Sequence, residues 1–212
     1  MVIMVFAAHP DDEVIGAGGT IAKYAREGRQ VVSVIFSYGE GSDPASEPEN
    51  IIQKRVNESK KAGKILGIKE TIFLGISDMR FSKDVAQPST RKKLSDILQR
   101  YRPKMIFTHS ADDLHPAHKG VGRVVKEVLD ELKLNPEIYA FTVSVPIKFK
   151  KRDMPRIYID VSETFRLKID ALKAFKSQKE LLSFYFIPLQ YFRAWFDGFK
   201  ARCKFAELFY KG

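Results

Sequence analysis

Histidine and acidic residues stand together at two places in the chain, in a pattern that suits metal binding. The first place is the run His9-Pro10-Asp11-Asp12-Glu13, and the second is the run His115-Pro116-Ala117-His118. The only other histidine, His109, lies shortly before the second run. A histidine and a carboxylate at i and i+3, joined by a histidine from elsewhere in the chain, are ligand types that zinc accepts. We therefore predict that His9, Asp12 and His118 are zinc ligands.

Such a site has the parts that a hydrolytic reaction needs. Three protein ligands leave a fourth position open for water, whose pKa zinc lowers from 15.7 to about 7. The neighbouring carboxylate of Asp11 could take the proton of that water, and His115 could donate a hydrogen bond to a developing oxyanion. Pro116 suits the first position of a helix, so His118 falls in the first turn, where the positive helix end favours a neutral imidazole.

The elements that must position these residues alternate along the chain. Short apolar runs rich in Val, Ile and Phe predict strands at Val2–Ala8, Gln30–Ser37, Thr71–Leu74, Lys104–Thr108, Glu137–Val143 and Arg156–Val161. Helical periodicity predicts helices at Gly18–Glu27, Glu49–Leu66, Ser89–Tyr101 and Pro116–Leu132. This alternation is typical of an α/β fold with a mostly parallel, Rossmann-like sheet and helices on both faces, and we expect a single domain over residues 1–212.

Open parallel sheets bind ligands beyond the carboxyl ends of their strands, and every histidine of this chain follows a predicted strand. The four histidines should therefore gather at one edge of the sheet. Residues Ser37–Pro48, rich in Gly, Ser, Pro and acids, are expected to form a mobile loop at the same edge. A further helix is expected from Glu163 to Ser183, and Phe184–Tyr210 should form an aromatic-rich C-terminal extension packed on the domain.

Charge is distributed unevenly. The net charge is +10, but residues 1–144 carry 21 basic and 19 acidic residues, whereas residues 145–212 carry 15 and 7. The same C-terminal third holds 15 of the 25 aromatic residues. The main alternative function is therefore a nucleic-acid or anionic-surface binding module without catalysis. We favour core and subunit-interface packing, because the aromatic residues cluster too tightly to be separate base-stacking platforms. This predicts a homo-oligomer through the aromatic region and no stable nucleic-acid partner.

Composition bounds the class of protein further. Hydrophobic residues at 44% and charged residues at 29% exclude a disordered chain. The single cysteine, Cys203, cannot form an intramolecular disulfide, which favours a reducing compartment. The apolar opening Met1–Ala8 is too short for a transmembrane segment and has no basic residues before it, so we expect neither a membrane span nor a signal peptide. We predict a cytoplasmic protein.

Two other interpretations of the N-terminal run carry less weight. Asp12 or Glu13 could merely cap a helix, but the adjacent Asp11 argues against this because neighbouring carboxylates repel each other. The glycines of Gly16-Ala17-Gly18-Gly19 could belong to a nucleotide-binding loop. They begin well after the first strand has ended, and Ile21 stands where the third glycine should be, so we favour close helix–sheet packing.

The order and spacing of several motifs resemble one known family. The motifs are Ala8-His9-Pro10-Asp11-Asp12-Glu13, Tyr38-Gly39-Glu40-Gly41, Arg55 with Glu58, Leu74-Gly75 with Asp78, Arg102-Pro103, Asp113-Leu114-His115-Pro116-Ala117-His118, Lys176-Ser177-Gln178 and Ala206-Glu207-Leu208-Phe209. They are similar to those of the PIG-L/LmbE-like zinc N-deacetylases, from residue 5 to about residue 180, with the last motif similar to the closing segment of the family. That family removes acetyl groups from N-acetylglucosamine-containing small molecules.

The resemblance implies a role for each matching residue. It places zinc on His9, Asp12 and His118, makes Asp11 the general base and His115 the oxyanion partner, and assigns Arg55, Asp78 and Glu40 to substrate binding. One position departs from the family, which usually has Asp where this chain has Ala117. Because that Asp orients the preceding histidine, we expect another acid, with Asp112 and Asp113 the nearest in sequence, to hold the ring of His115.

Overall fold

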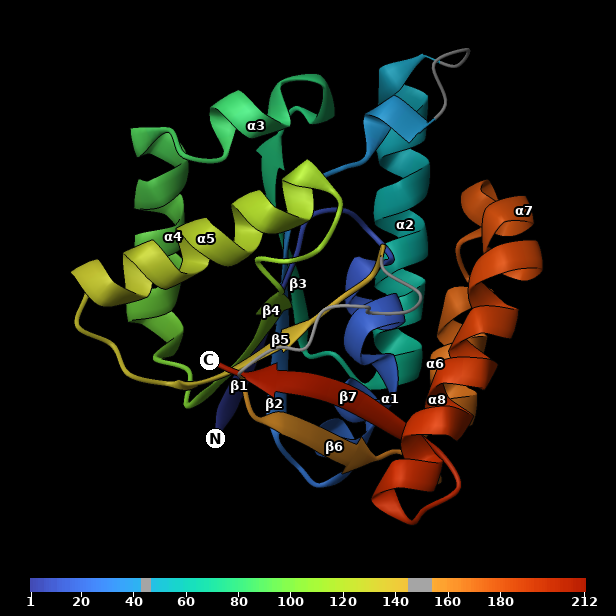
Figure 1. Ribbon diagram of the computed structural model, residues 1–212. Coiled ribbons are helices and arrows are strands. Elements are labelled where there is room, and N and C mark those ends of the chain that lie inside the picture. Colours follow the sequence, from blue (N-terminus) through green and yellow to red (C-terminus); the bar gives the residue numbers. More distant parts are fainter. Residues whose placement is uncertain (43–46, 145–153) are drawn as a thin grey trace.

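The computed structural model describes residues 1–42, 47–144 and 154–212. Its centre is a seven-stranded sheet in the order β3-β2-β1-β4-β5-β7-β6 (Figure 1). The strands are β1 (Val2–Ala7), β2 (Gln30–Ser37), β3 (Glu70–Ile76), β4 (Met105–His109), β5 (Glu137–Phe141), β6 (Arg156–Asp160) and β7 (Ala206–Lys211). Strands β1 to β5 pair in parallel, and β7 runs antiparallel to both of its neighbours. The predicted mostly parallel α/β fold is confirmed.

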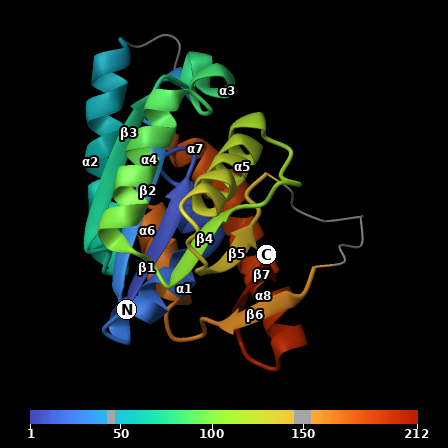
Figure 2. The same ribbon diagram turned by 90° about the vertical axis from the view of Figure 1, so that its left-hand side faces the viewer.

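Helices cover both faces of this sheet. They are α1 (Asp12–Arg26), α2 (Pro48–Leu66), α3 (Phe81–Asp84), α4 (Pro88–Tyr101), α5 (Pro116–Glu131), α6 (Phe165–Leu172), α7 (Lys179–Leu181) and α8 (Ile187–Ala201), with a π-helical turn at Leu182–Phe186. Helices α1, α2, α6 and α8 lie on one side, and α3, α4 and α5 lie on the other, where α4 and α5 face the viewer in Figure 2. No helix in the described part of the chain is long and apolar enough to cross a membrane.

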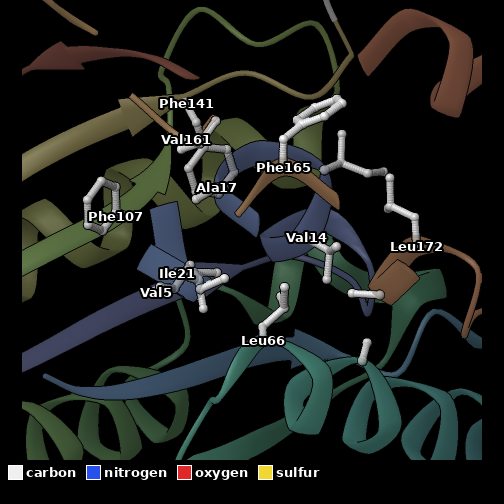
Figure 3. Packing of buried hydrophobic residues seen from close by; sticks show 14 of the residues in the cluster. Val5, Val14, Ala17, Ile21, Leu66, Phe107, Phe141, Val161, Phe165 and Leu172 are labelled. Carbon is white, nitrogen blue, oxygen red and sulfur yellow. The ribbon is translucent and has the colours of Figure 1, made fainter. Parts of the chain in front are cut away.

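The side chains of β1 show how the sheet separates two cores. Ile3 and Val5 point into the core under α1 and α2, whereas Met4 and Phe6 point into the core under α4 and α5. All four side chains are buried, because a strand covered on both faces exposes neither set of alternate residues. Figure 3 shows Val5 packed with residues of α1, among them Ile21.

The strand order reverses between β1 and β4, and this reversal positions the site. Chain connections leave these two neighbouring strands in opposite directions, so a crevice opens beyond their carboxyl ends. His9 follows β1 and His109 ends β4, which brings the two histidine-containing regions of the sequence to this crevice. Part of the predicted loop Ser37–Pro48 forms a short 3-10 turn at Glu40–Ser42 near the same edge, and residues 43–46 lie outside the described residues.

Helix α1 begins at Asp12, six positions earlier than the periodicity predicted. The glycines Gly18 and Gly19 therefore lie inside the helix, where a Cβ on either one would come within 2.9 Å of Lys168 or Val161. Gly18 and Gly19 permit close packing against α6 and the segment before it, whereas the expected helix–sheet packing occurs at Gly16, against Phe141 of β5. The glycines form no phosphate-binding loop. The early start follows from the acids of the first turn, which the positive end of a helix favours.

The C-terminal third differs from the prediction in two ways. The helix expected over Glu163–Ser183 ends at Leu172, and the chain continues through short turns into α8. The final segment is the strand β7, which inserts between β5 and β6, so an aromatic extension packed on the outside of the domain is not confirmed. Phe209 is buried in the core, but Trp195 and Phe199 of α8 are 57% and 77% exposed. Core packing therefore explains only part of this aromatic cluster, and its role in oligomerisation stays a prediction.

Candidate metal centre and active site

The structure brings the three predicted metal ligands together. His9 follows β1, Asp12 begins α1 and His118 lies in the first turn of α5. One possible ligand atom from each of these residues lies within 4.8 Å of the other two. The Asp12 Oδ2 atom is 3.4 Å from Nδ1 of His9 and 3.3 Å from Nε2 of His118. Asp12 and His118 are buried, and His9 is half-buried at the mouth of the crevice.

A second carboxylate orients each histidine. The Nε2 atom of His9 lies 2.9 Å from Oδ1 of Asp78, and Nδ1 of His118 lies 3.0 Å from Oδ1 of Asp113. Each of these carboxylates can accept the ring N–H of its histidine, so the other ring nitrogen faces Asp12 and is the one available to bind a metal. Carboxylate–histidine pairs of this kind are the usual support of zinc ligands. The donor set of two imidazoles and one carboxylate therefore fits zinc.

The protonation states of the ligand residues show which positive charges a bound metal would replace. Burial lowers the pKa of His9, but hydrogen bonds to Asp12 and Asp78 outweigh it and raise that pKa to about 9. Burial likewise opposes the charge on His118, and Asp12 and Asp113 raise its pKa to about 10. Burial disfavours the charge on Asp12 as well, but His118 and His9 hold its pKa well below the usual range. Without a metal, two imidazolium groups thus neutralise the buried acids.

Zinc uptake by the metal-free protein at pH 7 is expected to release about two protons, because His9 and His118 are protonated there and a metal ligand must be neutral. The number is measured by calorimetric titration in buffers of different ionisation enthalpy. Uptake of one zinc ion per chain without proton release would show that the two histidines are already neutral at pH 7 in the metal-free protein.

Asp11 lies next to the cluster in a strained backbone conformation. Its φ is 107°, a value that residues with a side chain rarely adopt, and strain of this kind concentrates at functional sites. Burial raises the pKa of Asp11 to about 6, although the nearby Arg55 guanidinium opposes the shift. Arg55 Nη2 donates to Oδ2 of Asp11 at 3.2 Å and to the carbonyl of Pro10 at 2.5 Å. A fixed carboxylate with a pKa near 6 suits a general base at neutral pH.

His115 is the N-cap residue of α5 and stands at the open side of the cluster. Its ring centroid lies 4.6 Å from that of His118 and 5.4 Å from that of His9. Burial lowers the pKa of His115, and the charges on His118 and His9 lower it further.

Of the two nearest acids expected to hold the ring of His115, Asp113 does not do so, because its carboxylate has other partners. Its Oδ1 atom contacts the ring of His118 and accepts the backbone N–H of His115, while Oδ2 accepts the backbone N–H groups of Val143 and Ser144. Asp113 is therefore a positioning residue for His118, which the sequence motif contains but did not identify as such.

The three residues assigned to substrate binding, Arg55, Asp78 and Glu40, also lie near the metal cluster, and each has different surroundings. Asp78 and His115 line a cavity of about 460 Å³ beside the metal cluster. Glu40 accepts the backbone N–H of Asp78 at 2.7 Å and so fixes that segment. Arg55 is only 3% exposed and contacts Asp11, so its surroundings suit a residue that positions the base. Arg80 and Lys83, which sequence reasoning did not single out, line the same cavity.

Sequence reasoning also missed the role of His109. Its ring stacks on that of His118, with centroids 4.1 Å apart, and its Nε2 atom accepts the backbone N–H of Ala8 at 3.0 Å. Burial lowers the pKa of His109 to about 4, helped by the charge on His118, so the ring is neutral. His109 thus ties the end of β4 to the end of β1 and forms one wall of the cluster. Its position after a strand was visible in the sequence, but its partners were not.

A mostly parallel α/β sheet with a His-Asp-His cluster at its switch point defines the class of protein, and comparison with known proteins gives the family. Residues 4–129 match the family described as PIG-L: GlcNAc-PI de-N-acetylase. The chain belongs to this family. It is 30% identical over 193 residues to the "Probable N-acetyl-alpha-D-glucosaminyl L-malate deacetylase 2" of Bacillus cereus, covering 85% of this chain and 84% of that protein.

Other relatives share the fold or the sequence pattern. The chain is 26% identical over 202 residues to the 4-oxalmesaconate hydratase of Pseudomonas putida, covering 86% of this chain and 76% of that enzyme. Among solved structures, it superposes on the N,N'-diacetylchitobiose deacetylase from Pyrococcus horikoshii with a TM-score of 0.82 and 23% identity, covering 100% of this chain and 83% of that one. The relatives of this chain are therefore named for two different reactions.

Proposed function

We propose that the protein is a zinc-dependent hydrolase that removes the acetyl group from an N-acetylglucosamine-type amino sugar or conjugate. The observation that carries this proposal is the cluster of His9, Asp12 and His118 with the Asp11 carboxylate beside it. Membership of the PIG-L family and the deacetylase relatives support the same reaction. We propose a small-molecule substrate and a cytoplasmic location, in line with the sequence predictions.

The residues of the site divide the work of amide hydrolysis. His9, Asp12 and His118 would hold the zinc ion, which when bound polarises the acyl oxygen and acidifies water. Asp11, held by Arg55, takes a proton from the attacking water and can return it to the departing amine. His115 at the open side donates a hydrogen bond to the oxygen on which negative charge develops. Asp78, in the cavity wall, is placed to contact sugar hydroxyls.

The hydratase relative supplies the main competing reaction, because water addition to a double bond also uses an activated water. The test is a screen of N-acetylglucosamine conjugates with the zinc-loaded enzyme, following free amine and acetate together. Equal amounts of amine and acetate are expected. A parallel assay follows the loss of ultraviolet absorbance of a conjugated unsaturated dicarboxylate. Turnover of that compound with no amine release from any conjugate would replace the deacetylase proposal with a hydratase.

The noncatalytic alternative for the basic C-terminal third is tested by heparin chromatography. A deacetylase that uses this region for packing should elute below physiological ionic strength. Retention above that ionic strength by a protein that releases no amine would favour the anionic-surface module.

Substitutions of Asp78 and Arg55 are expected to separate substrate contact from positioning of the base. Asp78→Asn keeps an acceptor for His9 but weakens contacts to sugar hydroxyls, so it should lower activity on an N-acetyl sugar about tenfold more than on acetanilide. Arg55→Met removes the partner of Asp11 and should lower activity on both substrates in parallel. Parallel losses in both variants would remove Asp78 from the substrate-binding group.

Ala117→Asp is expected to move the alkaline limb of the pH–rate profile to higher pH. Burial and the charges on His118 and His9 lower the pKa of His115, and a carboxylate two residues along the chain would oppose that shift by favouring imidazolium, so the rate should then fall at a higher pH. The profile of kcat/KM against pH measures the shift, with His115→Gln as the control that should lose this limb. An unmoved limb in both variants would show that His115 is not the titrating acid.

A further inference from the structure

A second cavity lies between α8, α1 and the β5–β7–β6 end of the sheet. Its volume is about 400 Å³, and its walls come from α1, α6, α8, β5, β6 and β7. None of the proposed metal ligands or catalytic residues lines it. At about 30 Å³ for each water in the liquid, this volume equals roughly 13 water molecules, which is room for a ligand of about a dozen non-hydrogen atoms. Pockets of this size commonly bind small molecules.

The lining of this cavity, which we call the α8 cavity, carries an excess of positive charge. Four cationic and two acidic residues line it, namely Arg156, Lys168, Arg193, Lys200, Asp197 and Glu207. Two of the six neutralise each other, because Nζ of Lys168 lies 2.6 Å from Oε1 of Glu207. The carboxylate of Glu207 also accepts the backbone N–H groups of Gly19 and Thr20 and so has little capacity left. Three cations therefore face Asp197 alone, which favours an anionic ligand.

Arg193 is the cation best placed to bind that anion. It is half-buried in α8, and its Nη2 atom donates to the carbonyl and the hydroxyl of Thr142 at 3.4 and 3.2 Å. Both acceptors are neutral, and among the described residues no carboxylate forms an ion pair with this guanidinium within 4.0 Å. A guanidinium has five N–H donors, so several remain for the planar carboxylate that it binds best.

Gln190 supplies an independent indication of a ligand. The residue lines the α8 cavity and is 4% exposed. Its side-chain Nε2 atom is buried and has no hydrogen-bond partner among the described residues. A buried donor without a partner is destabilising, and an oxygen atom of a ligand would supply the missing acceptor. An anionic oxygen of a ligand would satisfy both the unused donor and the cationic excess.

The remaining walls are apolar and include flat rings. The buried Phe141, Leu208 and the exposed rings of Phe192 and Phe196 line the cavity. The rings of Phe192 and Phe196 lie nearly parallel, with an interplanar angle of 9° and centroids 6.2 Å apart. Such walls favour a ligand whose body is apolar and flat.

We propose that the α8 cavity is a binding site for a small organic carboxylate with an aromatic or otherwise flat apolar body, held at its anionic end by Arg193 and Gln190. This site is separate from the proposed catalytic centre, and the proposal does not depend on the deacetylase reaction.

The test uses 4-phenylbutyrate as the probe, with its uncharged amide as a matched compound, in calorimetric titrations of the zinc-loaded protein. The acid should bind at least about tenfold more tightly than the amide, since a hydrogen bond to a charged group is worth at least this factor. Arg193→Met should weaken binding of the acid by about tenfold or more. The control is Arg166→Met on α6, whose side chain is 92% exposed and lies outside the cavity, and it should bind the acid as the wild type does.

Gln190→Leu gives a second readout that a merely structural role would not produce. Removal of the unsatisfied donor should leave the melting temperature unchanged or higher, while the affinity for 4-phenylbutyrate falls. If Arg193→Met fails to fold, Lys200→Met, at an exposed residue of the cavity lining, replaces it and should likewise weaken the binding of 4-phenylbutyrate.

Several results would overturn the proposal. One is equal affinity of the wild type and Arg193→Met, which is also the outcome if the probe binds to the zinc ion. The others are equal binding of acid and amide, a rise in melting temperature of Gln190→Leu with no loss of affinity, and no binding to the wild type at millimolar probe.

Discussion

Asp11→Asn is expected to lower the turnover of an N-acetylated amino sugar by about 10²–10⁴-fold while the zinc content stays at the wild-type level. Asparagine has the shape of aspartate and can still accept a hydrogen bond from Arg55, but it cannot take a proton from water. The size of the loss is the usual contribution of general acid–base catalysis. Turnover is measured as acetate release, and zinc is measured by elemental analysis of the same preparation.

The control for this prediction is the adjacent residue, Asp12→Asn. Asp12 lies within 3.4 Å of ring nitrogens of His9 and His118, so its substitution should remove metal as well as activity. Equal metal loss in the two variants, or full activity in Asp11→Asn, would contradict the division between base and ligand. The rate of the wild type should also fall as the pH drops through about 6, because protonation of Asp11 removes the base.

His118→Ala is expected to lose most of the bound zinc and nearly all activity. Three side chains supply the proposed ligands, and the two that remain cannot hold zinc in the usual tetrahedral site. Because His118 is 3% exposed and its Nδ1 is paired with Asp113, the loss also leaves a buried carboxylate without its ring partner. The variant should therefore also have a lower melting temperature than the wild type.

His115→Ala is the matched control for His118→Ala. It removes a histidine from the same helix turn but not a proposed ligand, so the zinc content should be unchanged and only turnover should fall. Wild-type zinc content in His118→Ala, or metal loss confined to His115→Ala, would reject the ligand assignment.

The parallel half of the fold and the position of the site could be predicted from sequence because both follow from local patterns. Buried parallel strands give continuous apolar runs, and the bounds predicted for β2, Gln30–Ser37, are the observed ones. His9 and His118 could be placed together because each lies after a strand or at a helix start, and parallel strands bring those points to one edge. These inferences need only spacing and the direction of the chain.

The parts that escaped prediction depend on contacts between distant segments. Strand β7 contains the charged residue Glu207, which is buried because Lys168 and backbone N–H groups of α1 bind its carboxylate. The sequence does not reveal these partners, so this segment was not predicted to be a buried strand. Asp113 was only one candidate partner for His115, and its contact with His118 was missed because its side chain reaches that ring through a turn whose geometry the sequence does not reveal. Helix α1 follows directly on Asp11, whose positive φ is not predicted by propensity for aspartate at this position.

The central claim is that one metal ion in the His9–Asp12–His118 cluster is required for hydrolysis of an N-acetyl amide. The most direct test titrates zinc into the metal-free protein and measures acetate release from an N-acetylglucosamine conjugate at each addition. Activity should rise linearly and reach a plateau at about one zinc ion per chain, and it should stay near zero throughout in His118→Ala. Full activity in the metal-free protein, or the same titration curve in His118→Ala as in the wild type, would contradict the account.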